Sequence, residues 1–215
     1  MVPPMTVAAI SDPRPYHHGD LRRALVDAAI RILEREGPSA LSLRAVAREA
    51  GVSPAAPYHH FKDKGELLEA VAHVGWEALG DGMAAVQGEV PDLSSLMTEI
   101  GVAYVRFSQD HPALYRVMYD TARDKDSLPE GMQDKEDGAY CLVRNTFRDA
   151  AGPEVPDVDI ELATIAAWCA AHGLAEMSGF AQFNPLKDAF GGDAGFLRAV
   201  LSHLGMFQAK QGQPG

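Results

Sequence analysis

The histidines most able to bind a metal come in two adjacent pairs, His17-His18 and His59-His60. An imidazole is a common zinc ligand, but a site needs several donors converging on one point. Adjacent residues project in different directions along a helix, and no cysteine or carboxylate completes a known ligand spacing around either pair. We therefore expect no metal site at these histidines.

A second candidate for chemistry is Cys169, which lies between Trp168 and His172. A thiolate beside a base can act as a nucleophile, so a Cys169/His172 site is conceivable. Such residues more often fill the core of a helical protein. The sequence also holds no phosphate loop, nucleophile elbow or dinucleotide fingerprint. We therefore expect no enzyme activity and no cofactor.

The composition is typical of a soluble globular protein. The chain has 215 residues, 47% of them hydrophobic and 23% charged, and can bury a core without disulfides. Two cysteines cannot build a disulfide framework, which favours a reducing compartment. The longest apolar run, residues 165–171, is far shorter than the roughly 20 residues that span a bilayer, and no secretory signal pattern is present. We expect a cytoplasmic protein that does not contact a membrane.

Charge is divided unevenly along the chain. Residues 1–65 contain nine Lys/Arg and seven Asp/Glu, a net charge of +2, whereas residues 66–215 carry −13. This acidic remainder argues against a general polyanion binder. The mildly basic end can still contact phosphate, because local charge sets the field that a partner meets. Ordinary surface variation explains the same numbers.

Apolar residues recur at helical spacing along most of the chain, and no segment alternates convincingly with the period of a strand. The predicted fold class is therefore all-α. Prolines indicate a disordered arm at 1–15, and residues 121–131 are polar and loop-like. Capping residues, Gly and Pro delimit the expected helices, which cover about 20–36, 42–50, 53–61, 63–79, 93–110, 113–120, 133–150, 157–183 and 194–208.

Two short helices joined by Gly51-Val52 are what a helix-turn-helix requires. Gly51 can take the positive φ of a tight turn, and Ala47 is small where the two helices approach. The outward face of the following helix has few charges, many hydrogen-bond donors and small side chains, which suits a major groove. Three helices of an ordinary bundle fit the same pattern. The outward residues are Ser53, Ala55, Ala56, Tyr58, His59 and His60.

Two runs carry a more specific likeness: Leu-Ser-Leu-Arg-x-Val-Ala-x-x-Ala-Gly-Val-Ser at 41–53, and Tyr-x-His-Phe-Lys-Asp-Lys-x-x-Leu-Leu at 58–68. With these runs, residues 16–72 resemble the DNA-binding domain of the TetR family of bacterial transcriptional regulators. The opening Tyr-His-His-Gly-Asp-Leu-Arg at 16–22 and Trp-Cys-Ala-Ala-His-Gly-Leu at 168–174 resemble the subgroup with a C-terminal Trp-His-Gly signature.

The resemblance implies a three-helix DNA-binding domain at 16–65, followed at 66–210 by an antiparallel helical bundle for ligand binding and dimerisation. It also implies that residues at the start of the second helix meet the DNA backbone, while those of the third helix meet phosphates and base edges. Arg14 on the arm is a further candidate for a contact with a phosphate or the minor groove. Pro57 departs from the family pattern and predicts an irregular first turn. The expected DNA contacts are Ser42, Arg44, Ser53, Pro54, Ala55, Ala56, Tyr58, His59 and Lys62.

The same resemblance implies a cavity for a small-molecule effector in the C-terminal bundle. Helical spacing alone does not distinguish cavity residues from a filled core. A mostly apolar lining favours a hydrophobic or aromatic effector, to which His172 can offer one hydrogen bond. The expected lining residues are Trp76, Tyr104, Phe107, Tyr115, Met118, Tyr119, Trp168, His172 and Met177.

The last two predicted helices are the expected homodimer surface. One carries a stripe with small members, which are Ile160, Ala163, Thr164, Ala167, Ala171 and Leu174. The other carries the partner stripe, which is Phe196, Leu197, Val200, Leu201, Leu204 and Phe207. Two copies would form a four-helix interface with two-fold symmetry, which sets the recognition helices about 34–36 Å apart and requires a palindromic operator on double-stranded DNA.

The expected function is that of a TetR-like repressor that leaves its operator when an effector binds one conformation better than the other. The helix at about 63–79 is the expected lever between the effector and the DNA-binding domain. The alternative is a helical enzyme or a protein-interaction module with a Cys169/His172 site and no DNA binding. Salt-dependent binding to duplex DNA separates these interpretations.

Overall fold

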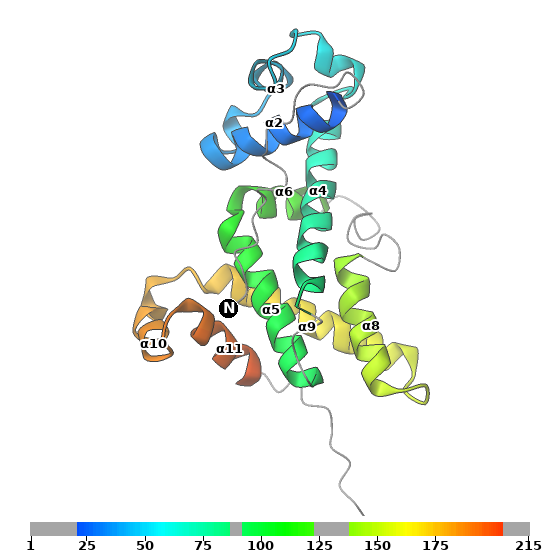
Figure 1. Ribbon diagram of the computed structural model, residues 1–215, viewed down its shortest axis with the longest axis vertical. Helices are drawn as coiled ribbons and strands as arrows, with labels where there is room; N and C mark the ends of the chain where they lie inside the picture. The colour runs from blue at the N-terminus through cyan, green and yellow to red at the C-terminus, as the bar shows by residue number, and fades with distance from the viewer. Residues whose placement is uncertain (1–20, 87–91, 123–137, 204–215) are drawn as a thin grey trace, which may run out of the picture. The chain divides into compact units, whose positions relative to one another are not determined.

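The computed structural model describes residues 21–86, 92–122 and 138–203. Within these ranges every regular element is a helix, which confirms the all-α fold class (Figure 1). The predicted arm at 1–15 and the predicted end of the last helix beyond His203 lie outside the described residues.

Contacts between residues divide the chain into two compact units. The head unit consists of described residues 21–78 and 111–122. The body unit consists of the described residues in 79–110 and 138–203. The chain therefore passes from head to body and back before it ends in the body.

The head unit starts with α2, whose apolar residues recur every three or four positions and form one buried stripe. Leu25 and Leu33 are completely buried on this stripe. Gly37 ends the helix in the left-handed region, with φ of +80°. The elements of the unit are α2 (Leu21–Glu36), η1 (Pro38–Ala40), α3 (Leu43–Glu49), η2 (Ala56–His59), the part of α4 (Lys64–Ala84) up to Ala78, and α6 (Pro112–Ala122).

Helix α6 belongs to the head unit although it follows a body helix in the chain. It packs against α2, where the Glu34 carboxylate accepts a hydrogen bond of 3.1 Å from the Leu114 N–H. This bond satisfies one of the N–H groups that the first turn of a helix leaves free. On α4, a Cβ at Gly75 would lie 2.6 Å from the Met118 sulfur. Glycine at 75 therefore permits the close approach of α4 and α6.

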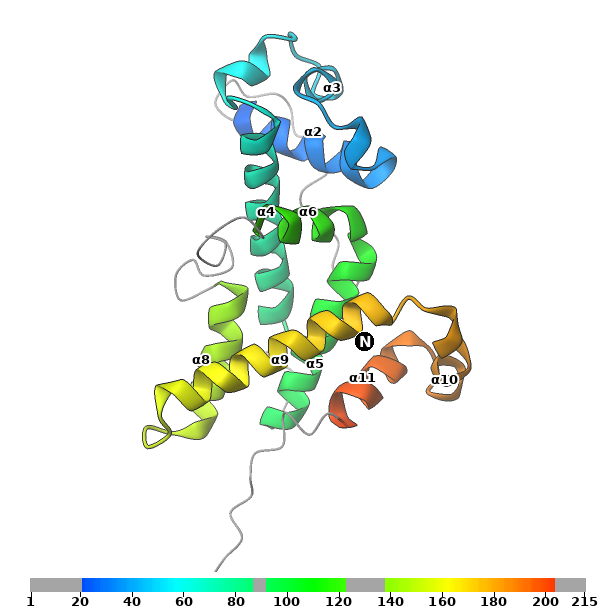
Figure 2. The same cartoon turned by 180° about the vertical axis from the view of Figure 1, so that it is seen from behind.

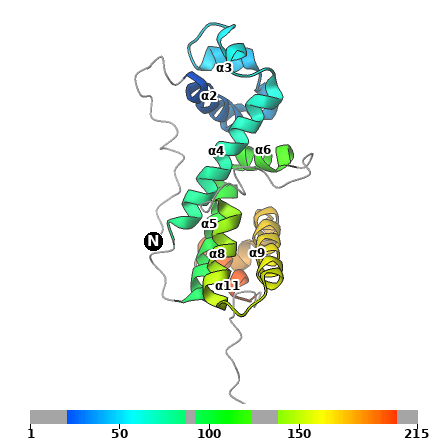
Figure 3. The same ribbon diagram turned by 90° about the vertical axis from the view of Figure 1, so that its right-hand side faces the viewer.

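The body unit is organised around α5, which packs against α8, α9 and α11. Buried side chains occupy most positions of α5, the pattern of a helix surrounded by others. Figure 2 shows α9 running across α5 and α8, and Figure 3 shows these helices from the side. Besides the end of α4, the elements are α5 (Leu93–Asp110), α8 (Ala139–Ala151), α9 (Asp157–Met177), η3 (Ala181–Phe183), α10 (Asn184–Ala189) and α11 (Asp193–His203).

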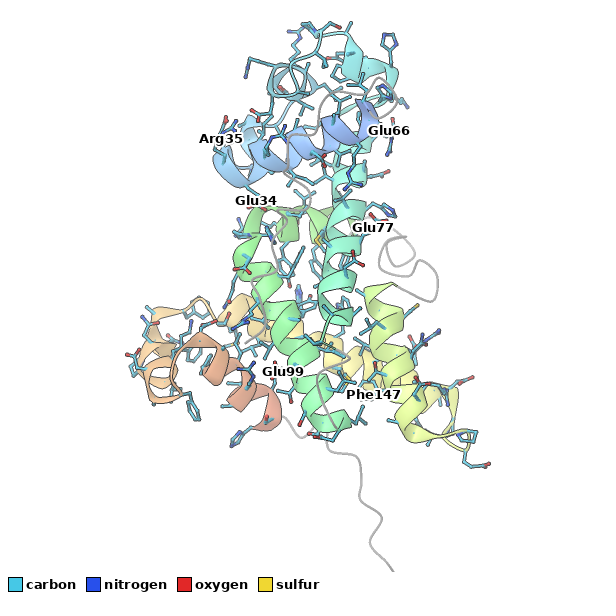
Figure 4. All side chains as sticks on the ribbon, viewed as in Figure 1. Glu34, Arg35, Glu66, Glu77, Glu99 and Phe147 are labelled. Carbon is cyan, nitrogen blue, oxygen red and sulfur yellow. The ribbon has the colours of Figure 1, made fainter. Side chains whose placement is uncertain are left out.

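Helix α11 is fastened to α5 by an ion pair and a close approach. Arg198 donates two hydrogen bonds to the Glu99 carboxylate, with Nε–Oε1 of 2.5 Å and Nη2–Oε2 of 2.8 Å. Glu99 is labelled on α5 in Figure 4. A Cβ at Gly101 would lie 2.9 Å from a methyl carbon of Leu201. The small residue and the bidentate pair together set how α11 lies on α5.

The predicted helix at 157–183 is too long. Helix α9 ends at Met177, and Phe180 has an extended backbone, with φ of −72° and ψ of 127°. The short helix α10 was not predicted. It has Pro185 in its first turn, where the missing N–H costs nothing. The apolar residues keep helical spacing through a break that one extended residue makes, which is why the predicted helix ran on.

Candidate nucleic-acid interface

The predicted DNA contacts begin at α3. Ser42 caps this helix, because its Oγ accepts a hydrogen bond of 3.1 Å from the Ala45 N–H. Helix α3 buries Val46 and Ala47 and exposes Arg44. One face of α3 is thus fixed in the head unit while the other is open to solvent.

The turn after α3 has the geometry that the sequence predicted. Gly51 has φ of +70°, and its N–H donates to the Arg48 carbonyl at 3.2 Å. The Val52 N–H donates to the Ala47 carbonyl at 2.9 Å. These two bonds form a Schellman motif, which ends a helix and turns the chain sharply. The turn aims the next residues away from the axis of α3.

The recognition segment, residues 53–60, is not the regular helix that was predicted. Ala56–His59 forms a single 3-10 turn, with the Tyr58 N–H donating to the Ala55 carbonyl at 3.2 Å. Pro57 has no N–H with which to continue an α-helix, and it is buried. Tyr58 is 54% exposed. The segment is therefore held by a buried proline and presents most of its other side chains to solvent.

All of the predicted DNA contacts lie in the head unit, and all are exposed except Ala56, which is partly buried. Arg44, Tyr58, His59 and Lys62 supply hydrogen-bond donors for phosphate oxygens. The small residues of the recognition segment leave room for base edges and thymine methyl groups. The arrangement suits duplex DNA, and the role of each residue stays a prediction. These residues are Ser42, Arg44, Ser53, Pro54, Ala55, Ala56, Tyr58, His59 and Lys62.

Phe61 and the start of α4 hold the end of the recognition segment. Phe61 is 1% exposed. Asp63 Oδ1 accepts a hydrogen bond of 3.0 Å from the Glu66 N–H, and Glu66 Oε2 accepts one of 2.6 Å from the Lys62 N–H. This reciprocal arrangement is a variant of the capping box. It fixes the backbone of Lys62, a predicted phosphate contact.

An ion-pair network ties α2 to α3. Glu49 on α3 accepts hydrogen bonds from Arg35 at 2.9 Å and from Arg31 at 3.1 Å. Arg35 also pairs with Glu36. The Arg35 and Arg31 guanidinium groups lower the pKa of Glu49 below its usual range. Arg31 and Arg35 are thus engaged within the protein, which was not predicted from the sequence.

The predicted effector-binding residues fall into both units. Four are in the head unit, where the Tyr119 ring lies 5.1 Å from the Trp76 ring and 5.0 Å from the Tyr115 ring, centroid to centroid. Three of them, Trp76, Tyr115 and Met118, are buried. They join α4 to α6 within the head unit.

The other predicted effector-binding residues are in the body unit. Tyr104 and Trp168 meet edge to face with centroids 5.3 Å apart, and the Tyr104 hydroxyl shares a hydrogen bond of 3.2 Å with His172 Nδ1. Phe107 is buried, whereas Met177 is 49% exposed. Whether any of these residues meets an effector stays a prediction.

Tyr140 on α8 joins this cluster without having been predicted. Its ring lies 5.7 Å from that of Trp168, and its hydroxyl donates to Glu161 on α9. Burial and this carboxylate raise the pKa of Tyr140. Only the packing of α8 on α9 brings Tyr140 to this cluster, so no local signal could have identified it.

The Cys169/His172 alternative gains no support from the positions of the two side chains. Cys169 is exposed on α9, whereas His172 is hydrogen-bonded to Tyr104. In the part of the chain that the structure describes, no three His, Cys, Asp or Glu residues form a group that could hold a metal ion.

The predicted dimer contact through the α9 stripe from Ile160 to Leu174 is wrong. All of its residues except Ala163 are buried within the chain, for example Thr164 at 0% and Ala167 at 6% exposure, because α9 turns this face toward α5 and α8. Phe196, Leu197 and Leu201 of the second stripe are also buried, while Leu204 and Phe207 lie outside the described residues. The spacing identified the apolar face of each helix but not which chain covers it.

A different face of α9 is exposed and apolar, and we call it the exposed stripe. Among the described helices, α9 is long and apolar enough to cross a membrane by length and composition. Only 22% of its apolar stretch is buried inside the protein, so most of the helix is not covered by the chain itself. A contiguous exposed apolar face is typical of a contact with another molecule. The exposed stripe comprises Val158, Leu162, Ile165, Cys169, Gly173 and Met177 of the helix and Phe180 just beyond its end.

Comparison with protein families gives two matches. Residues 25–71 match the family model described as bacterial regulatory proteins, tetR family. Residues 97–202 match the tetracyclin repressor-like C-terminal domain. Together the two matches cover most of the described chain.

Curated relatives include the HTH-type transcriptional regulator BetI of Rhizobium meliloti, which is 30% identical over 110 residues, 50% of this chain and 54% of the relative. An uncharacterized HTH-type transcriptional regulator of Haemophilus influenzae is 57% identical over 56 residues, 25% of this chain and 27% of the relative. The chain thus aligns with about half the length, or less, of these curated relatives.

Solved structures support the fold over nearly the whole chain. A protein of unknown function from Rhodococcus sp. RHA1 superposes with a TM-score of 0.68 and 28% identity, covering 90% of this chain and 97% of the other. A TetR-family transcriptional regulator from Haemophilus influenzae superposes with a TM-score of 0.58 and 19% identity, covering 85% and 94%. The second likeness concerns the fold alone.

Proposed function

Because the chain belongs to the TetR family of DNA-binding transcriptional regulators, we propose that it is a repressor that binds a palindromic operator as a homodimer and leaves it when a small molecule binds. The observation that carries the proposal is the head unit. Its Schellman turn at Gly51 sets an exposed, donor-rich recognition segment against α3, whose start is capped by Ser42. Both elements offer side chains to one duplex.

We assign the dimer contact to the exposed stripe of α9. Leu162 and Ile165 are 60% and 46% exposed, and a second copy of the stripe would remove both from water. A Cβ at Gly173 would meet nothing within 4 Å, so the backbone is open to a close approach there. Two-fold symmetry would pair each stripe with itself.

Two copies related in this way would present two recognition segments to one face of the duplex. Successive major grooves on one face are about 34–36 Å apart. The operator would then be a palindrome, each half read by one head unit. The contacts that we assign to each half are the predicted ones, with Lys62 and Arg44 on phosphates and the small residues of the recognition segment near bases.

We assign the effector to the aromatic cluster of the body unit. Tyr104, Tyr140 and Trp168 offer ring surface, and His172 offers a polar group. A hydrophobic or aromatic molecule with one hydrogen-bonding group suits this set.

Coupling to the head unit would run through α4, the expected lever, which continues from the head unit into the body unit, and through α6. Asp110, the last residue of α5, is in the body unit, and α6 begins two residues later in the head unit. Within the head, α6 is held by Glu34 of α2 and by the close approach at Gly75 of α4. A shift of α5 would therefore be passed to a helix that contacts the DNA-binding elements. The effector must favour one of the two arrangements for this to release DNA.

The remaining parts of the proposal follow from the family. We propose a cytoplasmic protein without enzyme activity and without a cofactor, with the DNA-binding domain at 16–65 and the effector and dimerisation domain at 66–210. Its proposed partners are duplex DNA, the effector and a second copy of the chain.

Selection from a random duplex pool by the full chain tests the proposal. We expect a recovered palindrome whose half-sites lie about one helical turn apart. A Lys62→Ala variant should bind the recovered duplex and random duplexes more weakly by similar factors, because a phosphate contact carries no sequence information. Failure to enrich any sequence, or enrichment of a site without symmetry, would contradict the proposal.

A further inference from the structure

Arg22 occupies an unusual place in the head unit. It lies in the first turn of α2, far in sequence from the recognition segment, yet its guanidinium carbon is 5.1 Å from the centroid of the Phe61 ring. Phe61 is almost completely buried, whereas Arg22 is exposed. A cation is therefore held against the ring that ends the recognition segment, next to Lys62.

Half of the cations in residues 21–64 are engaged within the protein. Arg23, the neighbour of Arg22, pairs with Asp27 at 3.3 Å. Arg31 and Arg35 pair with Glu49. Lys64 donates to a backbone carbonyl. Within this described range, the Lys and Arg side chains that form no ion pair with another described residue and no such backbone bond are Arg22, Arg44, Arg48 and Lys62.

The guanidinium carbon of Arg22 lies over the Phe61 ring. The attraction between cation and ring holds the group in place, and a guanidinium has five N–H donors with which to bind an oxyanion. The two nearest carboxylates in sequence to this ring, Asp63 and Glu66, accept hydrogen bonds from backbone N–H groups at the start of α4. Their negative charge is thereby partly compensated before any DNA phosphate arrives.

We infer that Arg22 is a DNA-backbone contact of the head unit, positioned by Phe61 to bind the phosphate beside the one met by Lys62. Arg44 and Lys62 are predicted DNA contacts, and Arg48 lies on the same helix as Arg44. Arg22 is the one of these four cations that lies on α2, so it would add a contact from a further helix. The contact extends the interface beyond the helix-turn-helix and sets affinity on all sequences. The inference rests on the proposed function, since it requires that the recognition segment meets DNA.

The matched pair Arg22→Ala and Arg23→Ala tests the inference. Both remove one positive charge from the same helical turn, but only Arg22 lies on Phe61. We would titrate the full chain into a fluorescent duplex of mixed sequence at several salt concentrations. In Arg22→Ala, the slope of log K against log salt should become shallower by about 0.9 for each phosphate that this side chain neutralises in the wild-type complex, and affinity at low salt should fall several-fold. Arg23→Ala should change the slope by less than half as much.

A third variant separates charge from position. Arg22→Lys keeps the charge but replaces the planar guanidinium group that lies over Phe61. It should keep most of the salt dependence of the wild-type chain and lose part of the affinity. If Arg22→Lys behaves like the wild-type chain in both respects, positioning by the ring is refuted. Thermal unfolding of each variant establishes that the head is folded.

The failures of the two proposals are distinguishable. If the wild-type chain ignores every duplex, the proposed function fails. If the wild-type chain binds and Arg22→Ala keeps its affinity and salt slope, or shifts no more than Arg23→Ala, the role of Arg22 alone is overturned.

Discussion

The predicted DNA contacts of the head unit and the aromatic cluster of the body unit are held in different ways. Beside the predicted DNA contacts, Ser42 and Asp63 bond to N–H groups three residues away. In the aromatic cluster, the polar contact joins residues far apart in sequence, Tyr104 and His172. Local bonds can be read from spacing, whereas distant ones need the packed structure. This difference explains why the local backbone geometry around the predicted DNA contacts was more predictable than the aromatic cluster.

Truncation of two aromatic rings of the head should affect different properties, stability for Phe61 and DNA binding for Tyr58. Phe61→Ala should lower the free energy of unfolding by about 3–5 kcal/mol, because the ring is almost completely buried. Tyr58→Ala should change it by no more than about 0.5 kcal/mol, since Tyr58 is 54% exposed, and yet weaken DNA binding. Denaturant unfolding and duplex binding measure the two quantities. Equal destabilisation by both variants would refute the division into buried support and exposed contact.

A charge placed on the exposed stripe of the body should weaken the dimer. Leu162→Glu should make dimerisation less favourable by about 2 kcal/mol or more, because it puts a carboxylate in an apolar interface. Arg144→Ala on the exposed face of α8 is the matched control and should leave the dimer intact. Light scattering over a dilution series measures the mass. A monomeric wild-type chain, or a dimer unaffected by Leu162→Glu, would exclude the stripe as the contact.

Removing a polar contact between residues far apart in sequence should lower the free energy of unfolding by less than the loss of a buried ring. Tyr104→Phe deletes the hydroxyl that bonds to His172 and keeps the ring on Trp168. We expect a decrease of about 0.5–1.5 kcal/mol in unfolding free energy and unchanged binding to the operator without effector. Reduced operator affinity in this variant would show that the contact shapes the head as well as the body.

The contribution of Glu49 to the pH dependence of the unfolding free energy should be smaller still. Its pKa is lowered in the folded chain by Arg35 and Arg31, so its contribution to stability is present above the unfolded pKa of about 4.3 and is lost as pH falls through the lower folded value. Because Arg35 is exposed and Glu49 is partly exposed, water and salt screen the pair, and its contribution to stability should be small. Unfolding measured from neutral pH to acid should be less pH-dependent in Glu49→Gln. An identical pH profile in both chains would refute the contribution.

Much of the fold was predictable because its signals are local. Helix ranges followed from capping residues and apolar spacing, and Gly51 predicted a positive φ that is observed. The recognition segment was mispredicted as a regular helix, although Pro57 already indicated an irregular turn. The break after Met177 was missed because helical spacing continues through Phe180, which is extended.

The partners of residues in the body could not be predicted from the sequence. The apolar stripe of α9 that contains Thr164 was recognised, but only packing shows that the same chain covers it. Tyr140 and the Gln109–Ser178 hydrogen bond of 3.1 Å depend on which helices meet. In the head, the engagement of Arg31 and Arg35 by Glu49 likewise required the orientation of α3 on α2.

Varying the half-site spacing of the selected operator tests whether two head units read one duplex by symmetry. Inserting about five base pairs, half a helical turn, between the half-sites would put the two recognition segments on opposite faces of the DNA. We predict that binding of the full chain to this duplex falls to the level of a single half-site. Undiminished affinity for the lengthened duplex would contradict reading by symmetry.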